Sequence, residues 1–249
     1  MAVSESAVAG LFQGPPAYEP RTPWRPGWAL LTGVLIVVIG IAGAAFVSGT
    51  GAASGAPWRQ DMTALATLGV WQAMTVVLTV LASALFGGRV RDVLALRAPA
   101  SPPTVYVKAV LLMVLLQGVV SVVQYEYLQQ DMYADLRPFV QLFGEQWVLA
   151  LLVVGVGAPL SEELLFRGFL LSALARSRFG FSGAALITTA LWTALHAGYS
   201  LAGIVEVFLI GLFFSWLLWR TGSLRVAIFC HALYNSFIIV ALRHVPLPT

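Results

Sequence analysis

Long apolar runs, separated by short polar segments, dominate this sequence. A helix needs about 20 apolar residues to cross the hydrocarbon core of a bilayer, and runs of about that length recur along the chain. Hydrophobic residues make up 59% of the chain and charged residues 10%, whereas a soluble domain has about 25% charged residues. These features predict an all-α polytopic transmembrane helix bundle of about seven spans, with six to eight as the range. The expected spans are residues 28–48, 62–87, 105–125, 147–174, 182–197, 204–219 and 224–242.

The basic residues lie at the ends of the apolar runs and do not gather into one patch. Cytoplasmic loops of membrane proteins carry an excess of Lys and Arg. We therefore expect a cytoplasmic N-terminus and a multi-pass protein of the plasma (inner) membrane, with the lipid bilayer as its surroundings and no nucleic acid partner. The pattern predicts no particular oligomeric state. On this topology the inside segments hold Arg21, Arg25, Arg89, Arg91, Arg97, Arg176, Arg178, Arg220 and Arg225, and the outside segments hold Arg59, Arg137 and Arg243.

Composition divides the chain into four regions. Residues 1–27 are polar and proline-rich, a composition that cannot form a packed core, so we expect a disordered cytoplasmic tail there. Residues 28–146 hold the first three spans and an acidic loop. Residues 147–242 hold the last four spans, and residues 243–249 form a second tail.

Several ionisable residues lie within the apolar runs, and most of them follow residue 160. Such residues usually face the interior of a bundle and mark a functional site. Glu163 and Arg167 are four residues apart, which places them on one helix face and predicts an ion pair. Glu162 points to a neighbouring sector and has no partner on its own helix. A carboxyl group of this kind suits a general base or acid.

Two further pairs with the same spacing follow, Trp192 with His196 and His231 with Asn235. A carboxylate and a histidine can activate a water molecule, and an asparagine amide or a ring N–H can stabilise an oxyanion. This set suits hydrolysis of an amide bond. Equally, Glu162, His196 and His231 are a ligand set that zinc or another divalent metal accepts. The spacing leaves both mechanisms open, one with no cofactor and one with a metal.

The three motifs, in this order, resemble the CPBP family, which includes the type II CAAX prenyl endopeptidases and the bacteriocin-processing and Abi-type homologues. The motifs read "EELLFR" from Glu162, "WTALH" from Trp192 and "HALYN" from His231. The resemblance covers roughly residues 147–242, which we expect to be the catalytic core. One departure is Trp192, which stands where the family motif usually has phenylalanine.

The resemblance implies an intramembrane endopeptidase acting on a membrane-associated or lipidated peptide or protein. By this resemblance Glu162 and His196 activate the water, and His231 with Asn235 holds the oxyanion. Glu163 and Arg167 support the site. The family name carries over neither a prenylated substrate nor the choice between a glutamate-dependent and a metal-dependent mechanism.

Two other functions compete with this one. Membrane glutamates and histidines also relay protons, as in a proton-coupled transporter. A non-catalytic membrane scaffold or immunity protein could keep the same polar core for folding. The catalytic interpretation requires Glu162 and His196 to meet at a water-filled cavity. Counting along the spans places His196 nearer the outer side, so we expect tilted spans or a break at Pro159.

Overall fold

The structure, a computed structural model, describes residues 11–12, 14–52, 57–85, 88–130, 135–136 and 146–244. Within these residues it is helical with no strand, which confirms the all-α prediction. Much of the expected acidic loop and residues 245–249 lie outside the described ranges. The elements are α1 (Pro26–Ala52), α2 (Pro57–Ala84), α3 (Val90–Val93), α4 (Thr104–Val122), η1 (Val123–Tyr127), α6 (Trp147–Ala150), η3 (Leu151–Gly157), α7 (Ala158–Glu162), η4 (Glu163–Leu170), α8 (Leu171–Ala175), α9 (Gly180–Ala194), α10 (Leu201–Thr221) and α11 (Leu224–His244).

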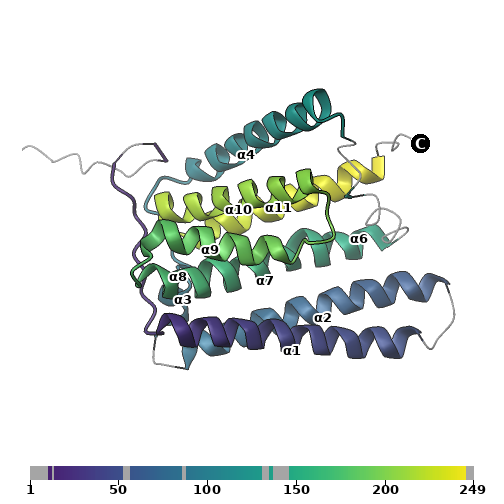
Figure 1. The fold of residues 1–249 in the computed structure, drawn as a ribbon, viewed down its shortest axis with the longest axis horizontal. Coiled ribbons are helices and arrows are strands. Elements are labelled where there is room, and N and C mark those ends of the chain that lie inside the picture. The colour runs from purple at the N-terminus through teal and green to yellow at the C-terminus, as the bar shows by residue number, and fades with distance from the viewer. Residues whose placement is uncertain are drawn as a thin grey trace, which may run out of the picture.

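Six helical segments of the described chain are long and apolar enough to cross a membrane, which lies within the expected six to eight. The remaining predicted span, the fifth at residues 182–197, is the 15-residue helix α9, which is shorter than the six segments. Figure 1 shows α9 lying alongside the long helices. The six segments are Pro26–Gly51, Met62–Ala84, Thr104–Tyr127, Trp147–Ala175, Leu201–Thr221 and Leu224–His244.

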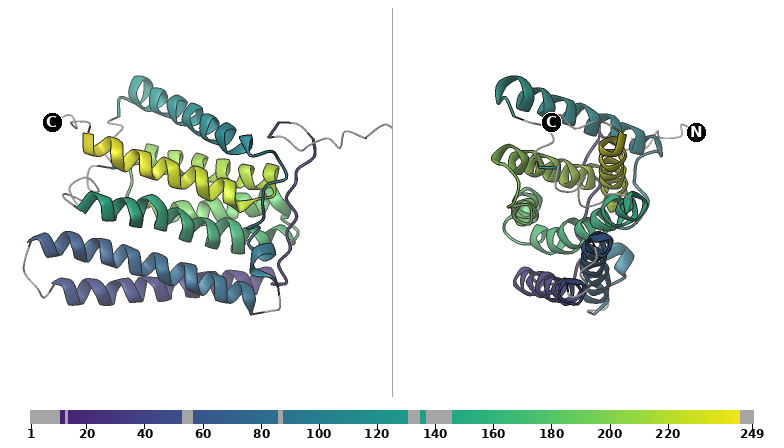
Figure 2. Two further views of the ribbon diagram at one scale, coloured as in Figure 1. Left: turned by 180° about the vertical axis from the view of Figure 1, so that it is seen from behind. Right: turned by 90° about the vertical axis from the view of Figure 1, so that its right-hand side faces the viewer.

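The helices form a hairpin on one side, a central group and one inclined helix on the other side (Figures 1 and 2). The hairpin is α1 with α2, and its helices approach closely at glycines. A Cβ atom on Gly43 would clash with the Met74 sulfur, so the missing side chain permits this contact. Helix α4 diverges from α10 and α11 toward its C-terminal end. Its outer face exposes Leu111, Val114 and Leu115, as expected of a helix against lipid.

One continuous helical segment, Trp147–Ala175, runs through the centre of the bundle. It alternates between α-helical turns and two π-helical stretches, η3 and η4. Pro159 lies at the start of α7, directly after η3. Because proline has no N–H and displaces the carbonyl of the preceding turn, a wider π-helical turn accommodates it. The segment therefore does not break at Pro159, contrary to one of the two expectations.

The polypeptide before α1 is packed against the bundle, which differs from the expected disordered tail. Residues 16–25 have no regular secondary structure, yet Tyr18, Thr22 and Trp24 are buried. The backbone N–H of Tyr18 donates to the carbonyl of Trp219 (3.2 Å), and the Trp24 indole donates to the carbonyl of Ala82 (3.1 Å). Buried aromatic side chains and hydrogen bonds to carbonyls at helix ends thus order a segment whose composition does not predict a packed core. Residues 1–10 and 13 lie outside the described part of the chain.

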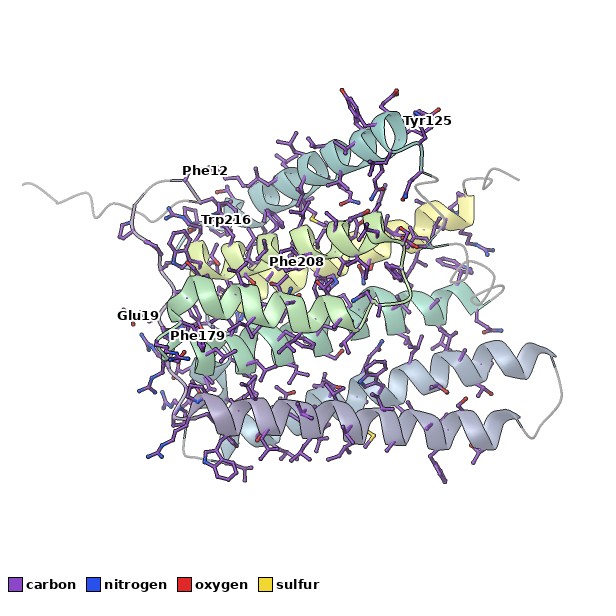
Figure 3. The ribbon with its side chains drawn as sticks, in the orientation of Figure 1. Phe12, Glu19, Tyr125, Phe179, Phe208 and Trp216 are labelled. Atoms are coloured by element: carbon purple, nitrogen blue, oxygen red, sulfur yellow. The ribbon has the colours of Figure 1, made fainter. Side chains whose placement is uncertain are left out.

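This N-terminal segment, residues 14–25, begins close to the C-terminus of α10. Arg220 donates from Nη2 to the carbonyl of Gly14 (3.0 Å) and from Nε to the carbonyl of Leu11 (2.7 Å). Gly222 has φ of +65°, and a Cβ atom there would lie 2.7 Å from the Ala17 carbonyl oxygen. Glycine is therefore required both by the turn and by the contact. Phe12 lies against Trp216 with ring centroids 5.9 Å apart, near the same end of the bundle (Figure 3).

Candidate active site

A cavity of about 590 Å³ opens among the central helices and holds all four predicted catalytic side chains. Its size is in the range of sites that bind small molecules or peptide side chains. The walls come from α2, α7, η4, the turn after α9, α10 and α11. The chain therefore brings Glu162, His196, His231 and Asn235 to one cavity, as the catalytic interpretation requires.

Glu163 and Arg167 form the ion pair that their spacing predicts. Arg167 Nη1 lies 3.1 Å from Glu163 Oε1, and both side chains are fully buried. Arg167 Cζ also lies 4.4 Å from the centroid of the Trp192 ring. Burying these charges is tolerable because they are paired, although a buried pair is weak evidence of net stabilisation. The contact between Arg167 and Trp192 therefore joins η4 to α9.

Glu162 differs from Glu163 in its surroundings. Its side chain is 23% exposed and faces the cavity. Oε2 accepts a hydrogen bond of 2.7 Å from the Trp192 indole N–H and lies 4.0 Å from Nε2 of His231. Glu162 is thus the accessible carboxylate of the two, and Glu163 is the enclosed one.

His231 lies between the two glutamates. Its Nδ1 is 3.0 Å from Glu163 Oε1, and its ring stacks on Phe214 with centroids 4.6 Å apart. An ionised carboxylate only accepts hydrogen bonds, so Nδ1 carries the proton in this pair. The opposite nitrogen, Nε2, then points toward Glu162 and the cavity.

His196 follows the last turn of α9. Its Nδ1 lies 3.2 Å from the backbone carbonyl of Trp192. Because a carbonyl only accepts, Nδ1 donates, and Nε2 of the neutral ring keeps a lone pair. The short length of α9 accounts for the position of this histidine, since the helix ends beside the cavity before completing a full span. Non-helical backbone at membrane depth is tolerated where it lines such a cavity.

Asn235 is joined to the π-helical stretch η3. Its Nδ2 donates to the carbonyl of Val154 at 3.1 Å. One amide hydrogen is used in this bond, and the NH₂ group carries a second donor. The contact holds α11 against η3 and orients the Asn235 amide at the cavity wall.

The predicted metal set does not form a metal site in the described residues. In these residues no group of three or more His, Cys, Asp or Glu side chains is arranged to hold an ion. His196 and His231 each direct Nδ1 to another partner, which is the usual arrangement when Nε2 binds a metal, and Glu162 Oε2 accepts the Trp192 indole N–H. The described residues thus hold no preformed cluster of three ligands, and Glu162, His196 and His231 as metal ligands stay a prediction.

A polar cluster that the motifs did not reveal lies on α10. Glu206 Oε2 accepts a hydrogen bond from Gln124 at 2.8 Å, and Oε1 accepts from Gln117 and, at 3.4 Å, from the Tyr234 hydroxyl. These bonds join η1 and α4 to α10 and α11. Gln117 and Gln124 are the two amides within the third apolar run, and their hydrogen bonds to α10 are of the kind that holds transmembrane helices together.

The polar side chains that line the cavity without belonging to a motif include Gln72 on α2 and Tyr199 before α10. Burial, together with the charges of Glu162, Asp135 and Glu206, raises the pKa of the Tyr199 hydroxyl. Tyr199 therefore remains a protonated donor at neutral pH. The sequence signal for Gln72 is that it is the single amide within the apolar run 62–87.

Comparison with known proteins agrees with the motifs. Residues 144–237 match the family model described as Rce1-like, type II CAAX prenyl endopeptidase Rce1-like. This match confirms the resemblance to the CPBP family of intramembrane proteases, and the matched region contains all three motifs.

A curated protein of Escherichia coli, described as an uncharacterized 24.3 kDa protein, is 40% identical over 87 residues. That alignment covers 34% of this chain and 40% of the Escherichia coli protein, so the chain spans less than half of this relative. No solved structure matches the chain.

Proposed function

We propose that this chain is an intramembrane endopeptidase that hydrolyses peptide bonds of a membrane-associated or lipidated peptide or protein. The observation that carries the proposal is the convergence of Glu162, His196, His231 and Asn235 on one cavity within a bundle of membrane-length helices. The Rce1-like match over residues 144–237 supports the same class of enzyme. The expected location is the plasma (inner) membrane, with a cytoplasmic N-terminus.

In the proposed reaction, Glu162 is the general base. A water molecule between Glu162 and His196 loses one proton to the Glu162 carboxylate, while the Nε2 lone pair of His196 accepts a hydrogen bond from its remaining O–H and orients the oxygen. The water oxygen bonds to the substrate carbonyl carbon, and the carbonyl oxygen becomes an oxyanion. Collapse then breaks the C–N bond, and the Glu162 proton passes to the leaving nitrogen. This sequence balances protons with no cofactor.

The oxyanion requires donors at the opposite side of the reacting carbon. The second amide hydrogen of Asn235 supplies one. His231 supplies another from Nε2 when its ring is doubly protonated, because Nδ1 already donates to Glu163. Glu163 and Arg167 hold His231 in this orientation without facing the substrate.

Comparative proteomics of membranes tests this function even while the substrate is unidentified. Cells expressing the wild-type chain, Glu162→Ala or Glu19→Ala are compared for new peptide termini. Glu19 is the matched control because it lies outside the cavity and its side chain is 75% exposed. We expect termini that are present with the wild type and with Glu19→Ala and absent with Glu162→Ala. Identical termini in all three membranes would reject the proposal and favour a scaffold or a transporter, and ion flux in proteoliposomes separates those two.

A further inference from the structure

Trp192 contacts three of the four predicted catalytic side chains, Glu162, His196 and His231. It lies on α9 and is 3% exposed. Its indole N–H donates to Glu162 Oε2 at 2.7 Å, and its backbone carbonyl accepts from His196 Nδ1 at 3.2 Å. A single residue therefore holds both side chains that the proposed mechanism uses to activate water.

We propose that Trp192 is the positioning residue of this site, orienting the Glu162 carboxylate through its indole N–H and the His196 ring through its backbone carbonyl. The inference rests on the proposed function and deepens it. One oxygen of Glu162 is fixed by the indole, which leaves the other oxygen for the water. The carbonyl fixes the His196 tautomer, so Nε2 keeps its lone pair.

The indole is itself held on several sides. Arg167 Cζ lies 4.4 Å over the ring, and the rings of His196 and His231 meet it edge-on at 5.1 and 5.7 Å. Within the described residues, Nε and Nη2 of Arg167 have no hydrogen-bond partner, so the indole face takes the place of acceptors. Glycine at position 211 leaves room for this arrangement, since a Cβ atom there would lie 2.9 Å from the indole Cε3.

The chain of contacts runs from the Glu163–Arg167 pair through the indole to Glu162. A cation above the ring polarises the indole and strengthens its N–H as a donor. A phenylalanine at this position would keep the aromatic contacts and the carbonyl but would have no N–H to offer Glu162. The Trp192→Phe substitution therefore removes one of the two positioning contacts and leaves the other in place.

The hydrogen bond can be tested without any activity measurement. In the purified chain labelled with ¹⁵N at the tryptophan indoles, the Trp192 resonance is assigned by its loss in Trp192→Phe. We expect Glu162→Ala to move this resonance upfield and Glu19→Ala to leave it unchanged. An unchanged Trp192 resonance in Glu162→Ala would overturn the proposal, and this result is independent of whether the chain is a protease.

The kinetic test uses a synthetic peptide spanning the strongest cleavage found only in wild-type membranes. Because the lost contact orients the base and does not bind substrate, Trp192→Phe should lower kcat roughly tenfold and leave KM within about twofold. Trp216→Phe, a substitution away from the cavity, is the matched control and should keep both constants. Wild-type kcat in Trp192→Phe, or a loss confined to KM, would contradict the positioning role.

A second replacement separates the donor from the shape of the ring. Benzothienylalanine introduced at position 192 keeps the bicyclic shape and carries sulfur where the indole has N–H. We expect it to reproduce the fall in kcat with unchanged thermal unfolding. Full activity with this side chain would show that only packing matters. The benzothienylalanine variant shows whether the indole N–H matters even if Trp192→Phe fails to fold. Loss of cleavage in Glu162→Ala remains the separate test of the proposed function.

Discussion

Oε1 of Glu163 lies 3.0 Å from Nδ1 of His231 and 3.1 Å from Nη1 of Arg167, so one buried oxygen serves two partners on different sides. Arg167 is on the same helical segment, and His231 is on α11. The shared oxygen therefore links the central segment to α11 and orients His231. The enclosed Glu163 therefore has a structural role, and the accessible Glu162 is the carboxylate that can react with a substrate or water.

Replacing Glu163 should lower the free energy of unfolding. Glu163→Gln leaves the fully buried Arg167 without a charged partner, which typically costs about 3–5 kcal/mol of folding free energy. Thermal unfolding in detergent measures the loss. Glu19→Gln, an exposed control, should stay within about 0.5 kcal/mol of the wild type. Equal unfolding of the two variants would contradict the structural role of Glu163.

Gly211 should not tolerate a side chain. A Cβ atom there would lie 2.7 Å from Arg167 Nη2 and 2.7 Å from Thr189 Cγ2. Gly211→Ala should therefore destabilise the fold by about 1–3 kcal/mol through overpacking. Gly118→Ala on α4 is the control, because its added Cβ meets nothing within 4 Å. A Gly211→Ala chain as stable as Gly118→Ala would show that the Arg167–Trp192 contact adjusts freely.

The N-terminal segment, residues 14–25, should detach at alkaline pH. Burial is the largest cause that raises the pKa of the Tyr18 hydroxyl from 10.0 to about 12. A raised pKa means that the packed segment holds the proton which the detached segment releases above pH 10. Docking is thus fully stabilised below pH 10 and weakens as the pH rises toward 12. Phenolate absorbance of the wild type minus that of Tyr18→Phe should titrate near pH 12, and a midpoint near 10 would show that Tyr18 is not buried.

The cluster around Glu206 should control the position of α4. Glu206 accepts hydrogen bonds from Gln117 on α4 and Gln124 on η1. Glu206→Leu removes both acceptors, so the distance distribution between spin labels on α4 and α10 should broaden. Tyr125→Phe, an exposed neighbour on η1, is the control and should leave the distribution narrow. If the spin-label distance distribution is unaltered in Glu206→Leu, apolar packing alone holds α4 in position.

Much of the fold follows from the sequence because the bilayer fixes the length of apolar helices. The run at 182–197 marked a helix correctly, but α9 ends at Ala194 because the following residues turn at the cavity. Composition also failed to predict that residues 14–25 pack against the bundle. There, Tyr18 and Trp24 find sites on helix ends that are far away in sequence, and composition carries no information about such sites.

The sequence predicted the residues of the candidate site more fully than the hydrogen bonds that join them. Helical spacing indicated the Glu163–Arg167 pair, because both residues lie on one segment. The bonds from Trp192 to Glu162 and from His231 to Glu163 join different segments, so no spacing rule could reveal them. Gln72 lies on α2, which carries no motif, and its place at the cavity depends on packing against α7.

The role of Glu162 as general base is measured by the cleavage rate of the purified chain in liposomes, acting on the peptide identified by proteomics. Glu162→Gln removes the proposed base and keeps the size of the side chain and an acceptor for Trp192. We expect kcat to fall by about 10²–10⁴-fold, with unfolding temperature and the N-terminal packing unchanged. Cleavage by Glu162→Gln within about threefold of the wild-type rate, a change too small for loss of a general base, would contradict Glu162 as the residue that activates water.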